Sequence, residues 1–108
     1  MTYSNKKITD SGILLAALAG QNATNSIVIS YYGEATIPIM IDLYYMQGSN
    51  KYYLLNNVII PSGASLSLDE SDLPYNNNQF DLFLDCQYTD EAQRDNPASV
   101  DCSICFGD

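Results

Sequence analysis

The chain has 108 residues, a hydrophobic fraction of 46% and a net charge of −9, with four Lys or Arg against thirteen Asp or Glu. This length and this hydrophobic content suit one folded domain with a single modest core, and they exclude wholesale disorder. Four basic residues are too few to follow a phosphate backbone or to hold an anionic bilayer, so the composition argues against nucleic-acid binding and membrane adhesion.

The N-terminal part of the chain is polar and then turns apolar. Residues 1–11 are predicted to be an arm that leads into a single domain covering residues 12–108. The apolar run at residues 13–19 leaves two structures open, a first strand or a single helical turn. Its Ala and Leu content favours helix, but it is short and apolar all round.

The clearest periodicity lies in residues 37–45, where apolar and mixed side chains alternate. Ile39, Ile41 and Leu43 share one side of this run with Ile37 and Tyr45. A period of two places alternate residues on opposite faces of a β-strand, one packed and one facing out. A Gly-Ser-Asn turn and a Pro-Ser-Gly turn then divide the chain up to residue 68 into two successive hairpins.

Further short strands are predicted on both sides of this meander, at residues 26–32, 80–87 and 100–106. Two long polar loops, residues 69–79 and 88–99, separate the later ones. Six or seven short strands without a clear helix predict an all-β fold, a single antiparallel β-sandwich that is Ig-like or jelly-roll-like.

The chain contains no histidine, which removes the commonest general base and the commonest metal ligand. Catalysis by Ser-His-Asp or Cys-His groups is thereby excluded. Carboxylate pairs could in principle transfer protons, but no positioned partner accompanies them. The residues therefore indicate a protein that is not an enzyme.

The three cysteines leave several interpretations open. Cys86 and Cys102 fall on the apolar sides of their strands, where a free thiol acts as a small hydrophobe, and this core role is preferred. A Cys86–Cys102 disulfide and a metal or redox pair at Cys102 and Cys105 are the alternatives. A metal site at these two cysteines is disfavoured, because Cys102 and Cys105 are an odd number of residues apart in a strand and should project from opposite faces.

Asp69, Glu70 and Asp72 cluster in one loop, and hard oxygen ligands of this kind can hold calcium. The stretch lacks the acid spacing and the glycine of an EF-hand loop. A solvated turn is therefore the preferred interpretation, with calcium binding left open.

The side of the central strand that should face solvent carries large apolar groups. Met40, Tyr44 and Met46 share that side, and Phe83 takes the corresponding side of its own strand. Large apolar groups on an outer face are typical of a contact surface, so these four residues are the candidate partner interface. The alternative is that the N-terminal segment or a long loop covers this face.

The order of these segments resembles a small β-sandwich domain of virion proteins from tailed bacteriophages. The matching residues are Ser26-Ile27-Val28-Ile29-Ser30, the alternating strand at residues 37–45, and the hairpin at residues 80–84 and 100–106. Residues 52–66, YYLLNNVIIPSGASL, look like the family's "YYLLKNVxIPAGxSL" segment. The likeness covers about three quarters of the chain, and it departs from the family pattern in the loop at residues 88–99 and the run at residues 12–20.

This resemblance implies a structural role without catalysis or cofactor. We expect a bacteriophage virion subunit, assembled in the host cytoplasm, that binds capsid or tail proteins in several copies, with capsid decoration as the first expectation. A neck, tail or fibre-associated accessory protein is the alternative. A host-glycan-binding module, with tyrosines and loop carboxylates holding a sugar, is the alternative from another class.

Overall fold

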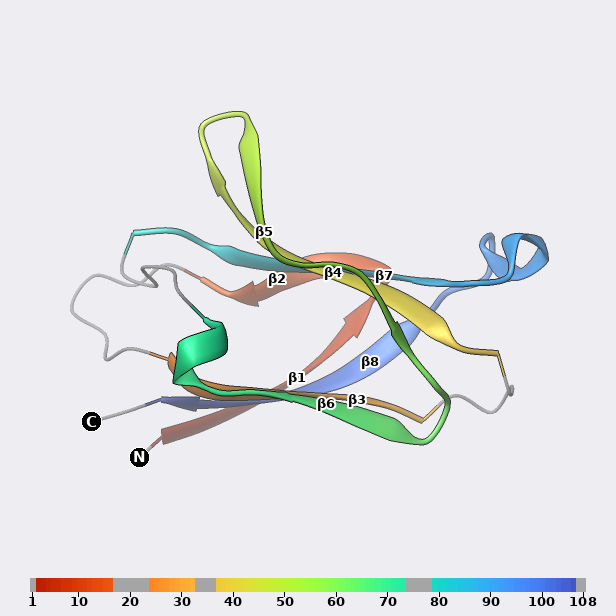
Figure 1. The fold of residues 1–108 in the computed structure, drawn as a ribbon, viewed down its shortest axis with the longest axis horizontal. Coiled ribbons are helices and arrows are strands. Elements are labelled where there is room, and N and C mark those ends of the chain that lie inside the picture. Colours follow the sequence, from red (N-terminus) through yellow and green to blue (C-terminus); the bar gives the residue numbers. More distant parts are fainter. Residues whose placement is uncertain (1, 17–23, 33–36, 74–78, 107–108) are drawn as a thin grey trace.

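The computed structural model describes residues 2–16, 24–32, 37–73 and 79–106. Within these residues the chain forms two four-stranded antiparallel sheets that face each other (Figure 1). The strands are β1 (Thr2–Thr9), β2 (Ser11–Leu15), β3 (Thr24–Tyr31), β4 (Ile39–Gln47), β5 (Asn50–Ile60), β6 (Ala64–Leu68), β7 (Leu82–Tyr88) and β8 (Ser99–Phe106). Two short 3-10 helices, η1 (Glu70–Asp72) and η2 (Glu91–Gln93), lie in the two polar loops.

The strand order identifies the kind of sandwich. The first sheet runs β1-β8-β3-β6 and the second sheet runs β2-β7-β4-β5. Strands β1 to β4 therefore pair in turn with β8, β7, β6 and β5, so the first half of the chain runs antiparallel to the second half. This nested pairing of eight strands over two sheets is the topology of a jelly roll. The predicted all-β antiparallel sandwich is confirmed, and of the two variants expected the chain adopts the jelly-roll arrangement.

The N-terminal segment differs from its expected role as an arm. Thr2–Thr9 pair with β8 in a continuous antiparallel register and form an edge of the first sheet. Among the described side chains of this strand, Ile8, opposite Val100, is the one in the core, while the exposed Asn5 and Lys7 lie on the outer side. A strand with one inward apolar residue shows almost no alternation, which is why the sequence does not predict β1. With β1 included, the described residues form eight strands, against the six or seven predicted.

The ambiguous run after the arm is a strand in its first part. Ser11–Leu15 form β2 and pair with β7, with Leu14 fully buried and Ile13 on the outer face. The strand alternative is therefore confirmed over these residues. Residues 17–19 of the run lie outside the described residues.

Asp10 is the corner at which the chain leaves the first sheet and enters the second. Its φ of 63° lies in the left-handed region, which Asp and Asn tolerate better than most residues. Its N–H donates to the carbonyl of Ala98 (2.8 Å), its carbonyl accepts from the N–H of Cys86 (2.7 Å), and its carboxylate accepts from the N–H of Ala98 (3.1 Å). One residue thus joins β7 in the second sheet to the start of β8 in the first.

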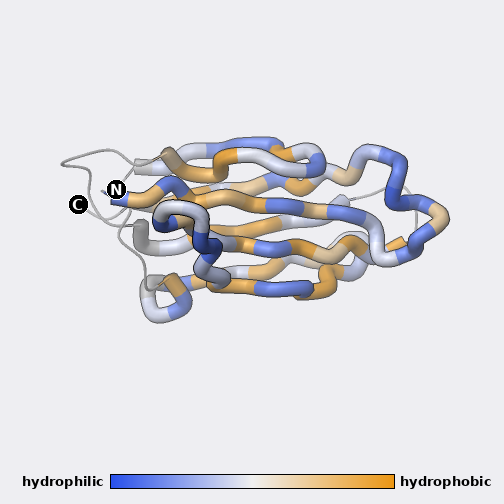
Figure 2. Tube along the Cα trace, turned by 90° about the horizontal axis from the view of Figure 1, so that it is seen from above, coloured by the Kyte–Doolittle hydropathy of each residue, from blue (hydrophilic) through white to orange (hydrophobic). Residues whose placement is uncertain are grey.

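The core fills the space between the sheets. Hydrophobic and hydrophilic residues follow one another along the strands, as the colours of Figure 2 show. In a β-strand such alternation places the hydrophobic residues on one face, here the inner one. Fully buried side chains come from both sheets and include Ile27, Ile29, Ile39, Ile41, Leu43, Leu82, Leu84 and Ile104. Burying one such side chain stabilises the fold by roughly 1.5–3 kcal/mol.

The β4–β5 hairpin bends because β5 holds extra residues opposite β4. The register shifts on either side of Leu43. At the first shift Asn57 has a φ of 56°, and its N–H donates to the carboxylate of Asp42 (2.7 Å). Bulges increase local twist. The far end of the hairpin, closed at Gly48 with a φ of 65°, accordingly projects away from the sandwich (Figure 1).

Asp10→Ala should lower the free energy of unfolding by about 1–3 kcal/mol, because it removes the acceptor for a backbone N–H and puts an unsuitable residue at a positive φ. Asp10→Asn keeps both the acceptor and the tolerance of this conformation, so it should lie within about 0.5 kcal/mol of the wild type. Urea unfolding of the three proteins measures the difference. Equal losses in the two variants would contradict the role given to this corner.

Candidate functional site

The four residues predicted as a partner interface lie on the outer face of the second sheet. Tyr44 and Phe83 are opposite each other in the β4–β7 register, and their rings stack at 5.4 Å between centroids with 12° between planes. Met40 lies four residues before Tyr44 in the chain, on the same face of β4, and is opposite Gln87. Met46 lies farther out, in the projecting hairpin, opposite Lys51.

The register extends this pair into a row that crosses all four strands. Ile13 lies opposite Phe83, and Tyr53 lies opposite Tyr44 with ring centroids 5.5 Å apart. We call Ile13, Phe83, Tyr44 and Tyr53 the aromatic row. Ile13 is 43% exposed and Tyr53 is 47% exposed, so both ends of the row face solvent. Ile59, opposite Met40 and 59% exposed, adds a further apolar group to the same face.

Sequence patterning does not place Ile13, Tyr53 and Ile59 on this face. Ile13 lies in a run without alternation, and the bulges in β5 interrupt the period of two between Tyr53 and Ile59. The alternative that the N-terminal segment covers the face does not hold for Thr2–Thr9, because β1 lies in the first sheet.

Tyr44 is the centre of the row and is only 6% exposed although it points outward. The neighbouring rings cover it from both sides, and the Lys51 ammonium lies 4.6 Å from its ring centroid. Its hydroxyl donates to the carboxylate of Asp85 (3.2 Å). Burial and then the nearby Asp85 carboxylate raise the pKa of Tyr44 to about 12. A preformed ring cluster of this kind loses little conformational freedom on binding.

Carboxylates lie directly beside the aromatic row. Asp42 and Asp85 are opposite each other in the β4–β7 register. The Ser11 hydroxyl donates to Asp85 (2.6 Å). A hollow of about 190 Å³ opens here, lined by Asp10, Met40, Asp42, Asp85, Cys86 and Gln87. No Lys or Arg lines this hollow, and Lys51 lies over the Tyr44 ring instead, so the hollow itself combines an apolar group with negative charge.

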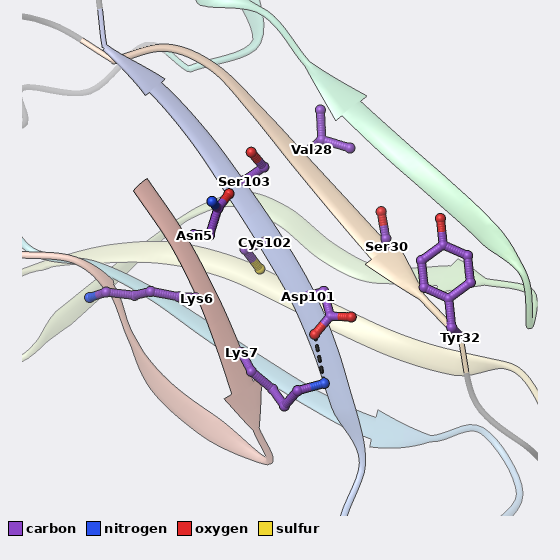
Figure 3. A pocket seen from close by; sticks show the side chains of 9 residues that line it. All are labelled: Asn5, Lys6, Lys7, Val28, Ser30, Tyr32, Asp101, Cys102 and Ser103. Carbon is purple, nitrogen blue, oxygen red and sulfur yellow. Dashed lines mark ion pairs between the residues drawn. The ribbon is translucent and has the colours of Figure 1, made fainter. Parts of the chain in front are cut away.

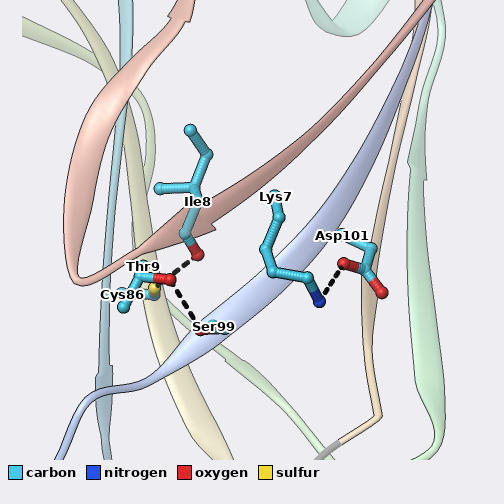
Figure 4. A network of polar contacts seen from close by, with 6 residues as sticks. All are labelled: Lys7, Ile8, Thr9, Cys86, Ser99 and Asp101. Carbon is cyan, nitrogen blue, oxygen red and sulfur yellow. Dashed lines mark hydrogen bonds and ion pairs between the residues drawn. The ribbon is translucent and has the colours of Figure 1, made fainter.

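All three cysteines are buried thiols that form no disulfide. Cys86 and Cys102 lie in the core, which confirms the preferred interpretation for both. The Cys86 thiol donates to the carbonyl of Ala98 (3.2 Å). It also lies 3.9 Å from the carbonyl of Ile8 (Figure 4). Burial raises the pKa of Cys86 to about 11 and that of Cys102 to about 12. Cys105 lies on the outer side of β8, opposite Tyr3, so it projects away from Cys102 as predicted.

The acidic loop at Asp69 and Asp72 forms a capped turn. The N–H and the hydroxyl of Ser71 both donate to Asp69, at 3.0 and 2.6 Å, and these bonds hold the pKa of Asp69 below its usual value. The N–H of Asp69 in turn donates to the Asp72 carboxylate (3.0 Å). These contacts account for the carboxylates as turn-forming groups. Across the described ranges, no set of three or more Cys, Asp or Glu side chains is placed to hold a metal ion.

Comparison with known proteins adds no further constraint. No protein family, no curated protein and no solved structure matches this chain. In the described part of the chain, no helix has the length and apolar character needed to cross a membrane. The geometry of the site therefore carries the functional argument.

The stability of the fold should fall as pH rises from about 9 towards 12. The unfolded thiols ionise near pH 9.0, whereas Cys86 and Cys102 resist ionisation until about 11 and 12 in the folded state. Over this interval the unfolded chain holds fewer protons, so each such thiol removes about 1.4 kcal/mol per pH unit. Urea unfolding across this range should show a shallower decline for Cys102→Ala than for the wild type. Equal slopes would contradict the burial of this thiol.

Proposed function

We propose that the chain is a non-enzymatic structural subunit that binds another protein through the outer face of its second sheet. The observation that carries this proposal is the aromatic row, which crosses all four strands and ends in exposed Ile13 and Tyr53. Aromatic residues in the middle of a patch, rimmed by polar groups, are typical of the energetic centres of protein interfaces.

The partner surface should carry basic side chains. The carboxylates of Asp42 and Asp85 border the aromatic row, and the chain as a whole has a net charge of −9. Opposite charge across an interface accelerates association and discriminates against acidic partners. An arginine is well suited to such a face, because its planar guanidinium both stacks on rings and pairs with carboxylates.

The finer proposal is a bacteriophage virion subunit, with capsid decoration ahead of a neck or tail position. The resemblance of residues 26–106 to virion β-sandwich domains supports it. The jelly-roll topology is compatible with it by analogy, since this fold occurs in viral capsid proteins and also in lectins. A small subunit that adds contact area between shell proteins stabilises the shell by mass action, without chemistry.

Replacement of exposed apolar residues at the ends of the patch should weaken binding to the particle. Tyr53→Ala and Ile59→Ser each remove an anchor without emptying the core, so each should lower affinity about tenfold. Co-sedimentation of the purified chain with particles that lack it, prepared from a deletion phage, measures this affinity. Tyr3→Ala is the control, because Tyr3 is 65% exposed and belongs to the first sheet.

Binding should also weaken as salt is raised, because the acidic border of the patch then attracts a basic partner less strongly. Absence of the chain from purified particles by mass spectrometry would overturn the virion proposal. Binding that both variants leave at the wild-type level would overturn the assignment of the interface to this face.

A further inference from the structure

The outer face of the first sheet, on the opposite side of the molecule from the aromatic row, carries a groove of about 400 Å³ (Figure 3). Its floor is formed by small side chains of the two central strands, Val28 and Ser30 from β3 and Ser103 from β8. Longer side chains, Asn5 from β1 and Tyr32 after β3, border it. Short residues in the middle of a sheet with long residues beside them make a trough, and its volume falls in the range of roughly 300–1,000 Å³ typical of small-molecule sites.

The groove also holds polar and charged side chains, and two of its charges are paired with each other. Lys7 and Asp101 lie opposite each other in the β1–β8 register and form an ion pair of 2.7 Å (Figure 3). The Asn5 amide and the Ser30 and Ser103 hydroxyls can each donate and accept hydrogen bonds. Lys6 also lines the groove, but its side chain points away from the other lining side chains (Figure 3) and its ammonium donates to the carbonyl of Ile13 (3.3 Å). The groove therefore offers several hydrogen-bonding atoms, and the charges directed into it are those of the Lys7–Asp101 pair.

Tyr32 adds a flat apolar surface at the same place. Its side chain is 67% exposed, the highest value among the exposed large hydrophobic residues. An exposed ring costs free energy in water, and it offers a surface on which a ligand with an apolar face can stack. The combination of one ring with several groups that both donate and accept suits a ligand that has hydroxyls on its edge and C–H groups on its face.

We propose that this groove binds a neutral oligosaccharide. Sugar rings have that division between hydroxyl edges and C–H faces, and a neutral sugar matches the internal balance of Lys7 and Asp101. An anionic ligand would find its cation already paired, and an apolar ligand would leave the polar groups of the groove without partners.

The groove also continues in a way that favours more than one sugar ring. A second hollow of about 160 Å³ shares Lys7, Tyr32 and Asp101 with it and extends towards Tyr88 and Pro97. Two hollows that share the Lys7–Asp101 ion pair match two linked sugar rings better than a single compact ligand. The assignment is independent of the docking face on the second sheet, and both surfaces can be occupied at once.

A glycan array of neutral and sialylated oligosaccharides, followed by calorimetric titration of the strongest neutral hit, tests the proposal on the full chain. Tyr32→Ala should lower the affinity for that glycan about tenfold or more, and Ser103→Phe should abolish binding by filling the floor. Tyr3→Ala is again the matched control, since Tyr3 is equally exposed on the same sheet but does not line the groove. Thermal unfolding establishes whether each variant is folded. If Ser103→Phe does not fold, Tyr32→Ala, which changes only an exposed side chain, still tests whether the groove binds the glycan.

Three results would overturn the proposal. These are no neutral glycan binding by the wild type, unchanged affinity in Tyr32→Ala, and an equal loss in Tyr3→Ala. A preference for sialylated over neutral glycans would likewise contradict the charge argument. Co-sedimentation of Tyr32→Ala and Ser103→Phe with the particle tests the docking face on the second sheet and does not depend on the groove. Failure of the groove assignment is therefore distinguishable from failure of the proposed docking face.

Discussion

The crossover at Asp10 is the constraint on which both sheets depend. Because the chain turns there through a positive φ, β1 can close the first sheet beside β8 while β2 closes the second beside β7. The hydrogen bonds of this residue to Ala98 and Cys86 fix the two edges relative to each other. Without β1 in this position, the edge of β8 would be open, and the groove would lose the wall that Asn5 supplies.

The two outer faces of the sandwich differ in chemistry, although each belongs to a sheet of four strands. The second sheet presents rings and aliphatic side chains beside the carboxylates of Asp42 and Asp85, which suits a basic protein surface. The first sheet presents hydroxyls, an amide, an ion pair and one exposed ring, which suits a neutral polyol. A subunit that is held to an assembly by one face and free to bind a ligand with the other would join the two hypotheses that the sequence left as alternatives.

Alternation made the central part of the fold predictable. Ile39, Ile41 and Leu43 identified the inner face of β4, and the same pattern placed Met40, Tyr44 and Phe83 on the outer face. The remaining features lacked such a signal. β1 has one inward apolar residue, Ile8, and the bulge at Asn57 interrupts the period in β5. The groove could not be predicted at all, since its residues come from strands that only the tertiary fold brings together, and the polar sequence of one of them, β1, indicates an arm.

The most direct test of the central claim is cryo-electron microscopy of the phage particle to which we assign this chain. We predict density for the sandwich with the outer face of the second sheet, including Tyr44 and Phe83, buried against a neighbouring protein that places basic residues near Asp42 and Asp85. Tyr32 and the groove of the first sheet should face solvent. A particle without this sandwich, or one in which the subunit is seated through the first sheet with the aromatic row open to solvent, would contradict the claim.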